Sequence, residues 1–234
     1  KRFTAPVKHY IELHIEQGPE LESRNKAIGI VTSAWAARKL RLKFCGAPSH
    51  TGPTPMPRRR DALLAASRAI DFLHLMACDQ KRLHVSAARM TLYPNSPNVV
   101  ASEVSVWFEF RHADDQIAFK FADEFLTKCR SIAELTDIEI EIVNDERRPT
   151  QYLDQSGIQL VETTCKKLGH SWDLMKTVAG HDALALQRKY PSTLIFVPSI
   201  NGLSHSPLEN SYQEDLETGL DVLTETLWTM IINQ

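Results

Sequence analysis

The sequence has neither an excess of basic residues nor a long apolar run, and both absences exclude classes of function. Lysine and arginine total 27 against 29 aspartates and glutamates, which gives a formal net charge of −2. This balance argues against a nucleic-acid-binding protein, which normally carries a basic surface. The apolar runs, such as residues 193–197, are far shorter than the roughly 20 residues of a membrane-spanning helix. We therefore expect no nucleic-acid partner and no membrane partner.

Cysteine is also scarce. The four cysteines, Cys45, Cys78, Cys129 and Cys165, are scattered and form no CxxC pair. This pattern fits reduced thiols in a cytoplasm better than a disulfide framework or a cysteine-rich zinc site, so we expect a cytoplasmic protein. The chain opens with Lys1 rather than Met and shows no secretory signal, and we expect it to be part of a longer protein.

Two common catalytic motifs are absent. No Gly-x-Ser-x-Gly stretch occurs, which argues against a serine hydrolase with a nucleophile elbow. No glycine-rich phosphate-binding loop occurs either, which argues against a nucleotide-binding enzyme of that type.

The central part of the chain alternates strand-like and helix-like patterns. The patterns predict four strands, at residues 39–44, 84–92, 104–110 and 138–142. Apolar residues at helical spacing predict two helices, at residues 60–77 and from Asp114 or Asp115 to Cys129. The order strand, helix, strand, strand, helix, strand is typical of a ferredoxin-like α+β sheet with both helices on one face.

The flanking segments have a different character. A helix is predicted at residues 157–168, a strand buried on both faces at 192–198, and a final helix whose apolar stripe is Leu216, Leu220, Leu223 and Leu227. The sequence thus predicts an α/β domain made from residues 1–27 and 149–234. A ferredoxin-like domain at residues 28–148 interrupts it, because the two ends of a domain often lie close enough to accept an insertion.

Several histidines lie where regular structure gives way to a turn. His14 and His205 each follow an apolar, strand-like run, a setting that suits a metal ligand and equally suits a structural histidine. His50 lies in a loop stiffened by three prolines, where it is either a poised hydrogen-bond donor or an exposed turn residue. The segment from Gly180 to Ala183 is either a ligand loop or the start of a helix.

Asn98 and Arg111 suggest a carboxylate clamp. A guanidinium group binds both oxygens of a carboxylate, and a nearby amide adds a further donor. The alternative is that Arg111 forms a surface ion pair with Glu109 or Asp114. The residues alone leave this choice open.

Six segments together carry a resemblance to a known family. They are ELHIEQGPELE (Glu12 to Glu22), SHTGPTPMPRRRDAL (Ser49 to Leu63), PNSPNVV (Pro94 to Val100), FRHAD (Phe110 to Asp114), AGHDA (Ala179 to Ala183) and PSINGLSHSP (Pro198 to Pro207). In this order they resemble the N-carbamoyl-amino-acid hydrolase and allantoate amidohydrolase family, which belongs to the dimetal aminoacylase and peptidase superfamily. The resemblance covers essentially the whole chain.

The resemblance implies a role for each of seven residues. It implies that His14 and His205 are ligands to two divalent ions, zinc or manganese, and that Gln17 and Gly180 contact the substrate. It further implies that His50 is the catalytic donor to the oxyanion, and that Asn98 and Arg111 hold the carboxylate of a small-molecule substrate. In this family the inserted domain is a lid through which two copies form a homodimer, and His50, Asn98 and Arg111 come from the partner subunit.

The same resemblance indicates what this chain lacks. The family's consecutive Glu-Glu pair, which includes the general base, occurs nowhere in the sequence. We therefore expect an incomplete or absent metal site and no activity from this chain alone. Two alternatives remain: an aminoacylase or dipeptidase of the same superfamily, and a non-catalytic dimerisation fragment. For the dimer contact we expect the strand at residues 104–110 or the helix at 60–77.

Overall fold

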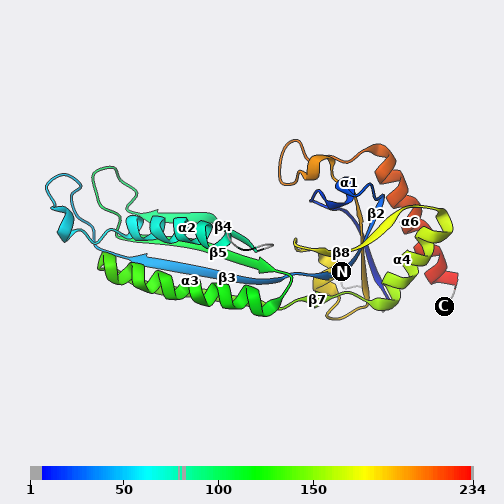
Figure 1. Cartoon of the computed structure of the whole chain (residues 1–234), viewed down its shortest axis with the longest axis horizontal. Helices are drawn as coiled ribbons and strands as arrows, with labels where there is room; N and C mark the ends of the chain where they lie inside the picture. Colours follow the sequence, from blue (N-terminus) through cyan, green and yellow to red (C-terminus); the bar gives the residue numbers. More distant parts are fainter. Residues whose placement is uncertain (1–6, 79, 81–82, 233–234) are drawn as a thin grey trace, which may run out of the picture. The chain divides into compact units, whose positions relative to one another are not determined.

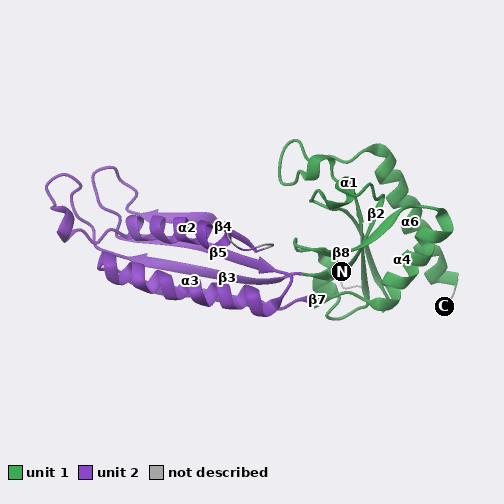
Figure 2. Ribbon diagram, in the orientation of Figure 1, with its two compact units in different colours: residues 1–34, 151–234 green, residues 35–150 purple. Residues whose placement is uncertain are grey.

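The structure is a computed structural model that describes residues 7–78, 80 and 83–232. The chain divides into two compact units (Figure 2): unit 1 comprises Lys1–Ala34 and Gln151–Gln234, and unit 2 comprises Trp35–Thr150. The sequence placed these boundaries at 27/28 and 148/149 instead. The first boundary moves because strand β2 (Ile28–Ala34) pairs with strands of unit 1, and its nearly continuous burial reflects that position.

Unit 2 contains two α-helices and a four-stranded sheet. Along the chain these are β3 (Ala36–Cys45), α2 (Ala62–Cys78), β4 (His84–Tyr93), β5 (Glu103–His112), α3 (Asp115–Thr136) and β6 (Glu139–Arg148), with a short 3-10 helix at Met56–Arg58. The strands lie in the order β4-β5-β3-β6 and all neighbours are antiparallel. This is the ferredoxin-like arrangement that the sequence predicted.

Alternation along the strands decides which face of this sheet is buried. Phe108 and Phe110 of β5 point to the helix side, where they pack against Phe125 of α3 at ring separations of 4.8 and 5.4 Å. Both helices cover this face, as Figure 1 shows. Asp114, one of the two predicted caps, accepts hydrogen bonds from the backbone N–H groups of Gln116 and Ile117 and so starts α3.

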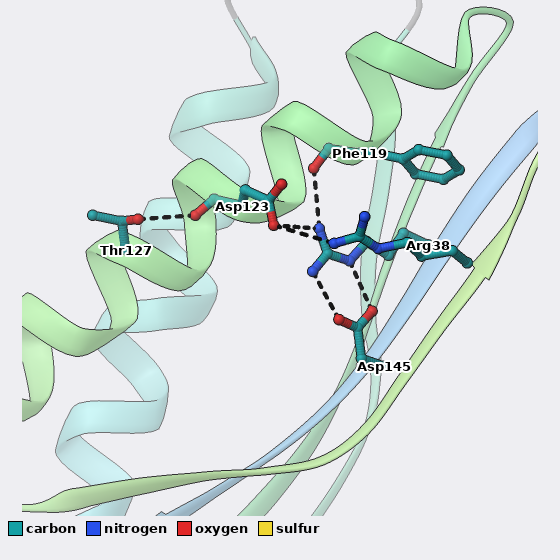
Figure 3. Close-up of polar contacts among 6 residues, drawn as sticks. Arg38, Phe119, Asp123, Thr127 and Asp145 are labelled. Atoms are coloured by element: carbon teal, nitrogen blue, oxygen red, sulfur yellow. Dashed lines mark hydrogen bonds and ion pairs between the residues drawn. The ribbon is translucent and has the colours of Figure 1, made fainter.

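One buried arginine joins α3 to the sheet (Figure 3). The Arg38 side chain is only 2% exposed, and its guanidinium group donates to both carboxylate oxygens of Asp145 on β6, each at 2.8 Å. It also donates to Asp123 at 2.6 Å and to the carbonyl oxygen of Phe119 at 3.1 Å, both on α3. The guanidinium group is thereby satisfied by two carboxylates and a carbonyl, which is what allows it to lie in an apolar interior.

Unit 1 is built around a five-stranded mixed sheet. Its strands are β1 (Tyr10–Ile15), β2, β7 (Gln151–Tyr152), β8 (Trp172–Thr177) and β9 (Ser192–Val197). β1 runs parallel to β9, β9 runs antiparallel to β2, and β2 pairs with both β7 and β8. Its helices are α1 (Glu20–Ser23), α4 (Gln155–Leu168), α5 (Asp182–Leu186) and α6 (Gln213–Ile232), with a 3-10 turn at Ile200–Gly202.

Helix α6 packs through a different face from the one that its leucines predicted. The buried residues are Gly219, Val222 and Thr226, whereas the predicted stripe is largely on the surface, with Leu220 56% exposed. Gly219 explains this orientation because it allows the helix backbone to approach β9 closely. A Cβ at this position would lie 2.5 Å from a Val197 methyl group.

This close approach makes Gly219→Ala destabilising, although alanine normally improves a helix. The added methyl group must displace Val197 or Leu13 in the packed interface, and we expect the free energy of unfolding to fall by about 1–3 kcal/mol. Urea unfolding followed by circular dichroism measures it. Gly180→Ala is the matched control, since its Cβ would meet nothing within 4 Å. Equal stability of both variants would contradict this packing argument.

Two further sequence expectations concern the environment of the chain. Among the described residues, no helix is both long enough and apolar enough to cross a membrane. All four cysteines are free thiols, and burial raises the pKa of Cys129 to about 12 and that of Cys165 to about 11. These two thiols are therefore poor nucleophiles and poor metal ligands at neutral pH.

Candidate functional site

A carboxylate and two imidazoles meet in unit 1. Glu12 and His14 are two residues apart on β1, so they point to the same face of the sheet. His181 directly precedes α5, which packs against β1 and β9. One possible ligand atom from each residue lies within 4.8 Å of the others, and this is the group of metal-ligating side chains that the described residues bring together.

Each member of this group is held by neighbours. His14 Nδ1 lies 2.7 Å from the Ile15 carbonyl oxygen, so Nδ1 carries the proton and Nε2 keeps a free lone pair. The Glu12 carboxylate accepts a 2.6 Å hydrogen bond from the Ala183 N–H and lies 3.7 Å from His181 Nδ1. The Thr177 hydroxyl is 3.1 Å from His181 Nε2. The three side chains are therefore oriented before any ligand arrives.

The electrostatics favour an ionised carboxylate in this group. Burial opposes ionisation of Glu12, but hydrogen bonds from His181 and the Ala183 N–H outweigh it, so the pKa of Glu12 lies below its usual value. The two imidazole rings meet edge to face at 4.8 Å, and His181 also packs at 5.0 Å from the Phe196 ring. A negative oxygen beside two imidazole nitrogens is a donor set that suits zinc and manganese.

The structure places the other predicted residues of unit 1 around this group without joining them to it. His205 is exposed, and its backbone N–H donates to Glu209 at 2.8 Å, which lowers the pKa of that carboxylate. Electrostatic interactions with His205 and His14 contribute to the same lowering, so Glu209 lies within reach of both histidines. The Gln17 N–H donates to the buried Ser199 hydroxyl at 3.0 Å.

The segment from Gly180 to Ala183 contains a helix start, one of its two predicted structures. Asp182 lies in the first turn of α5, as a helix start requires, and His181 just before it joins the candidate ligands. Gly180 itself is exposed and has no positive φ, so nothing in the structure demands glycine there.

In unit 2, two loops meet at one end of the sheet, which we call the tip (residues 46–57 and 94–101). His50 forms a β-bridge with Val99, and the N–H of the next residue, Thr51, donates to the Asn98 carbonyl oxygen at 3.1 Å. His50 Nδ1 accepts from the Gly52 N–H at 3.0 Å, so the proton of the neutral ring is on Nε2. His50 and Asn98 are both exposed. The tip therefore holds His50 and Asn98 on neighbouring, hydrogen-bonded segments of the chain.

Arg59 braces the tip, a role that the sequence did not reveal. Its guanidinium group donates to the carbonyl oxygens of Thr51 and Thr54 and so holds the loop around His50. The residue types of the run from Arg58 to Arg60 do not indicate such a role, because backbone acceptors cannot be recognised from the sequence.

Arg111 lies at the other end of β5 from the tip. Its guanidinium group donates to Glu109 at 3.0 Å, so the ion pair considered as the simpler alternative is present. Glu103 begins β5, and eight residues at about 3.3 Å each put Arg111 roughly 26 Å further along the strand. Within one copy, Asn98 and Arg111 are thus not brought together into a clamp.

The whole chain resembles one family of hydrolases. Residues 2–229 match peptidase family M20/M25/M40. The chain belongs to this family. It is 31% identical over 231 residues to an allantoate amidohydrolase of Escherichia coli, covering 96% of this chain and 55% of that protein. It is 30% identical over 224 residues to an N-carbamoyl-L-amino acid amidohydrolase of Geobacillus stearothermophilus, covering 96% and 55%.

Solved structures agree with this membership. A hydantoinase/carbamoylase family amidase from Burkholderia vietnamiensis superposes with a TM-score of 0.90 at 34% identity, covering 95% of this chain and 54% of that chain. The resemblance stated from the six sequence segments is thereby confirmed, and so is the α/β fold with its insert. This M20-family chain spans about half the length of the curated relatives it matches.

Sequence reasoning found one member of the ligand group and missed two. His14 was predicted, but Glu12 and His181 were not, because the expectation of an incomplete ligand set followed from the family's missing Glu-Glu pair. The signal for Glu12 was available, because a residue two positions from a strand histidine shares its face. No such signal existed for His181, whose contact with His14 depends on how the connection after β8 folds back over β1.

Proposed function

We propose that the chain is part of a metal-dependent amidohydrolase that cleaves the ureido or amide C–N bond of an N-carbamoyl amino acid or an allantoate-type substrate. The main observation in favour is the convergence of Glu12, His14 and His181 in a chain of this family. Relatives named for allantoate, N-carbamoyl-L-amino acids and ureidoglycolate support the substrate class. All three substrate types carry a carboxylate beside the bond to be cleaved.

The three side chains fit a divalent ion. One carboxylate and two imidazoles are a ligand set of known catalytic zinc sites, in which a fourth position stays open. Ligands about 2.1 Å from zinc lie roughly 3.4 Å apart in a tetrahedron, so atoms within 4.8 Å of one another need only small side-chain movements to bind. His14 would use Nε2, because Nδ1 is engaged with the Ile15 carbonyl oxygen. His205 is proposed as a ligand of a second ion.

The chemistry divides between the bound ions and the protein. When bound, the ions supply a water of lowered pKa and polarise the carbonyl group that is attacked. His50 Nε2–H donates a hydrogen bond to the oxyanion that forms, and one such donor contributes about 3 kcal/mol to lowering the barrier. Arg111 holds the substrate carboxylate, for which it exchanges its ion pair with Glu109. Gln17 and Gly180 are proposed as further substrate contacts.

The separation of His50 and Arg111 supports a site shared between two copies. They lie at opposite ends of one sheet, and no small substrate spans that distance. We propose that the tip of one subunit, with His50 and Asn98, completes the site that contains Arg111 of the other. This differs from the sequence expectation, in which Arg111 also came from the partner subunit.

The edges of the unit 2 sheet indicate how two copies pair. β5, an expected contact, is hydrogen-bonded to a strand on each side and cannot accept another. β4 and β6 are the edges, and β6 carries four acids, whereas the HVSAARMTLY sequence of β4 has none. Acidic side chains discourage pairing at an edge, so we propose that the dimer forms through β4 and the adjacent helix α2.

Substrate hydrolysis by paired variants tests both the clamp and the shared site. In the natural protein, Arg111→Lys should lower kcat/KM on carboxylate substrates at least about tenfold, because lysine loses the two-donor fork and misplaces the substrate. His50→Asn should be similarly impaired. When the two variants are mixed and allowed to reassemble, half of the dimers contain one subunit of each kind. Each mixed dimer has one intact site and one impaired site. The mixture should therefore recover up to about a quarter of wild-type activity.

The assay should compare N-carbamoyl amino acids, allantoate, N-acyl amino acids and dipeptides. Faster cleavage of dipeptides would favour the aminoacylase or dipeptidase alternative, and no cleavage at all would favour a dimerisation fragment. If mixing the variants restores nothing although mixed dimers form, His50 and Arg111 act within one subunit and the shared-site proposal is wrong.

A further inference from the structure

The open face of the unit 2 sheet carries rows of side chains with alternating charge. Because all strands are in antiparallel register, side chains from β4, β5, β3 and β6 line up across the sheet. One row contains Ser86, Glu109, Lys39 and Glu146; the next contains Arg89, Trp107, Arg41 and Asn144. The row after that contains Thr91, Ser105, Lys43 and Glu141. The middle row, which we call the arginine row, is the one of these three that has no acid.

Trp107 stands between the two guanidinium groups of the arginine row. The Arg41 group lies 4.5 Å and the Arg89 group 4.4 Å from the centre of the indole ring. β3 and β4 flank β5 on opposite sides, so the two arginines reach the ring from the strands on either side of it. Each cation is stabilised by the electrons of the ring, and Arg89 is exposed.

The two arginines differ from the other cations of this face. Lys39, Lys43, Arg111 and Arg148 each have a carboxylate within 4.0 Å. Among the described residues no acid lies that close to Arg41 or Arg89. Arg41 Nε is moreover buried and has no hydrogen-bond partner. A buried donor without an acceptor is costly in a folded protein, and a bound anion is one explanation for it.

We propose that the arginine row is a second anion-binding site, separate from Arg111, that takes a small dicarboxylate. Both guanidinium groups lie within 4.5 Å of the centre of the Trp107 ring, so a ligand that binds both has to pass the edge of the ring. Two carboxylates joined by a short chain reach one arginine each across the edge of the ring, in the two-oxygen geometry that guanidinium groups favour. Asn144, at the end of the row, offers an additional amide donor.

The flanking rows favour a small ligand over an acidic polypeptide. Glu109 and Glu146 lie on one side of the arginine row and Glu141 on the other. An extended acidic chain laid along the sheet would contact these carboxylates, and like charges repel at such distances. A small dianion contacts the arginine row alone.

Titration calorimetry on the full chain with succinate, glutarate and adipate tests the proposal. We expect saturable binding of at least one of them with a Kd below about 1 mM. Acetate should bind at least about tenfold more weakly, because it engages a single arginine. In a nitrogen-correlated NMR spectrum, the indole N–H signal that disappears in Trp107→Phe should be the one that shifts on binding.

Variants locate the site. Arg41→Gln and Arg89→Gln should each weaken binding at least about tenfold, because each removes a charge-assisted pair. Lys43→Gln is the matched control: it removes a charge from the neighbouring row, but one that is already paired with Glu103 at 2.9 Å, and it should change the Kd less than about twofold. If Arg41→Gln does not fold, the Kd of Arg89→Gln tests the proposal alone, because Arg89 is exposed and its replacement leaves the core unchanged.

Three results would overturn the proposal. The first is no saturable binding of any dicarboxylate at about 10 mM. The second is binding that Arg111→Gln abolishes and Arg89→Gln leaves unchanged, which assigns the anion to the proposed substrate clamp. The third is tighter binding of polyglutamate than of every dicarboxylate, which makes the row a docking surface for an acidic protein.

Discussion

Replacing Asp145 with alanine is expected to lower the free energy of unfolding of unit 2 by about 3 kcal/mol, because it leaves the buried Arg38 guanidinium group without its main partner. Asp145 accepts two hydrogen bonds from Arg38, whose side chain is 2% exposed, so its removal leaves a buried charge without these partners. Urea unfolding measures the loss, with hydrogen exchange of β3 amides as a readout specific to unit 2.

Asp123→Ala is the matched control for this experiment. Asp123 also pairs with Arg38, at 2.6 Å, but its side chain is 59% exposed, so its removal should cost no more than about 1 kcal/mol. Equal losses from the two variants would show that the burial of Arg38 does not determine the energy of this network.

The same pair has a defined pH dependence. The hydrogen bonds from Arg38 hold the pKa of Asp145 below its ordinary value of 3.8. A lowered pKa in the folded state means that the stabilisation is fully present above the unfolded value and is lost as the pH falls through the folded one. The stability gap between wild type and Asp145→Ala should therefore persist at pH 5 to 7 and shrink below about pH 4.

Replacing His14 with alanine is expected to weaken binding of a divalent ion to the chain at least about 100-fold. Changes to groups that merely orient a ligand already cost 10–100-fold, and His14 is proposed as a ligand itself. Calorimetry with Zn²⁺ and Mn²⁺ measures the affinity, and His181→Ala should behave in the same way. His170→Gln is the matched control, since His170 lies outside the candidate group.

The variant His205→Ala distinguishes binding of the second proposed ion from binding of the first. If His205 binds a second ion, its removal should lower the stoichiometry of binding and leave the affinity of the site at Glu12, His14 and His181 unchanged. Tight binding that persists in both His14→Ala and His181→Ala would mean that the metal site lies elsewhere in the chain.

Sequence reasoning predicted unit 2 well because its pattern was local. Leu40, Leu42 and Phe44 alternate with charged residues along β3, and a period of two already specifies which face is buried. The order of six elements then allowed the ferredoxin-like sheet to be recognised. Asp114 and Asp115 before an amphipathic stretch likewise indicated where α3 starts, and the structure shows that Asp114 is the cap.

The errors arose where neighbours in space, rather than in sequence, decided the outcome. The leucine stripe of α6 predicted the buried face, but Gly219 reverses it by permitting contact with Val197. The unit boundary fell too early because Ile28–Ala34 belongs to the sheet of unit 1, which no local pattern reveals. His181 was missed for a similar reason, since it joins His14 only after the chain folds back.

The two connections between the units run between paired strands, and this pairing has an evolutionary consequence. Ala34 and Gln151 are partners in the β2–β7 ladder, and Ala37 and Arg148 are partners in the β3–β6 ladder. The chain therefore leaves and re-enters each unit at the ends of two paired strands. A two-residue hairpin turn between Ala34 and Gln151 could replace the whole of unit 2 without moving the strands of unit 1. Recombination can exchange one such module for another as a single cassette. A lineage can thus exchange unit 2 for another module while the fold of unit 1 stays intact.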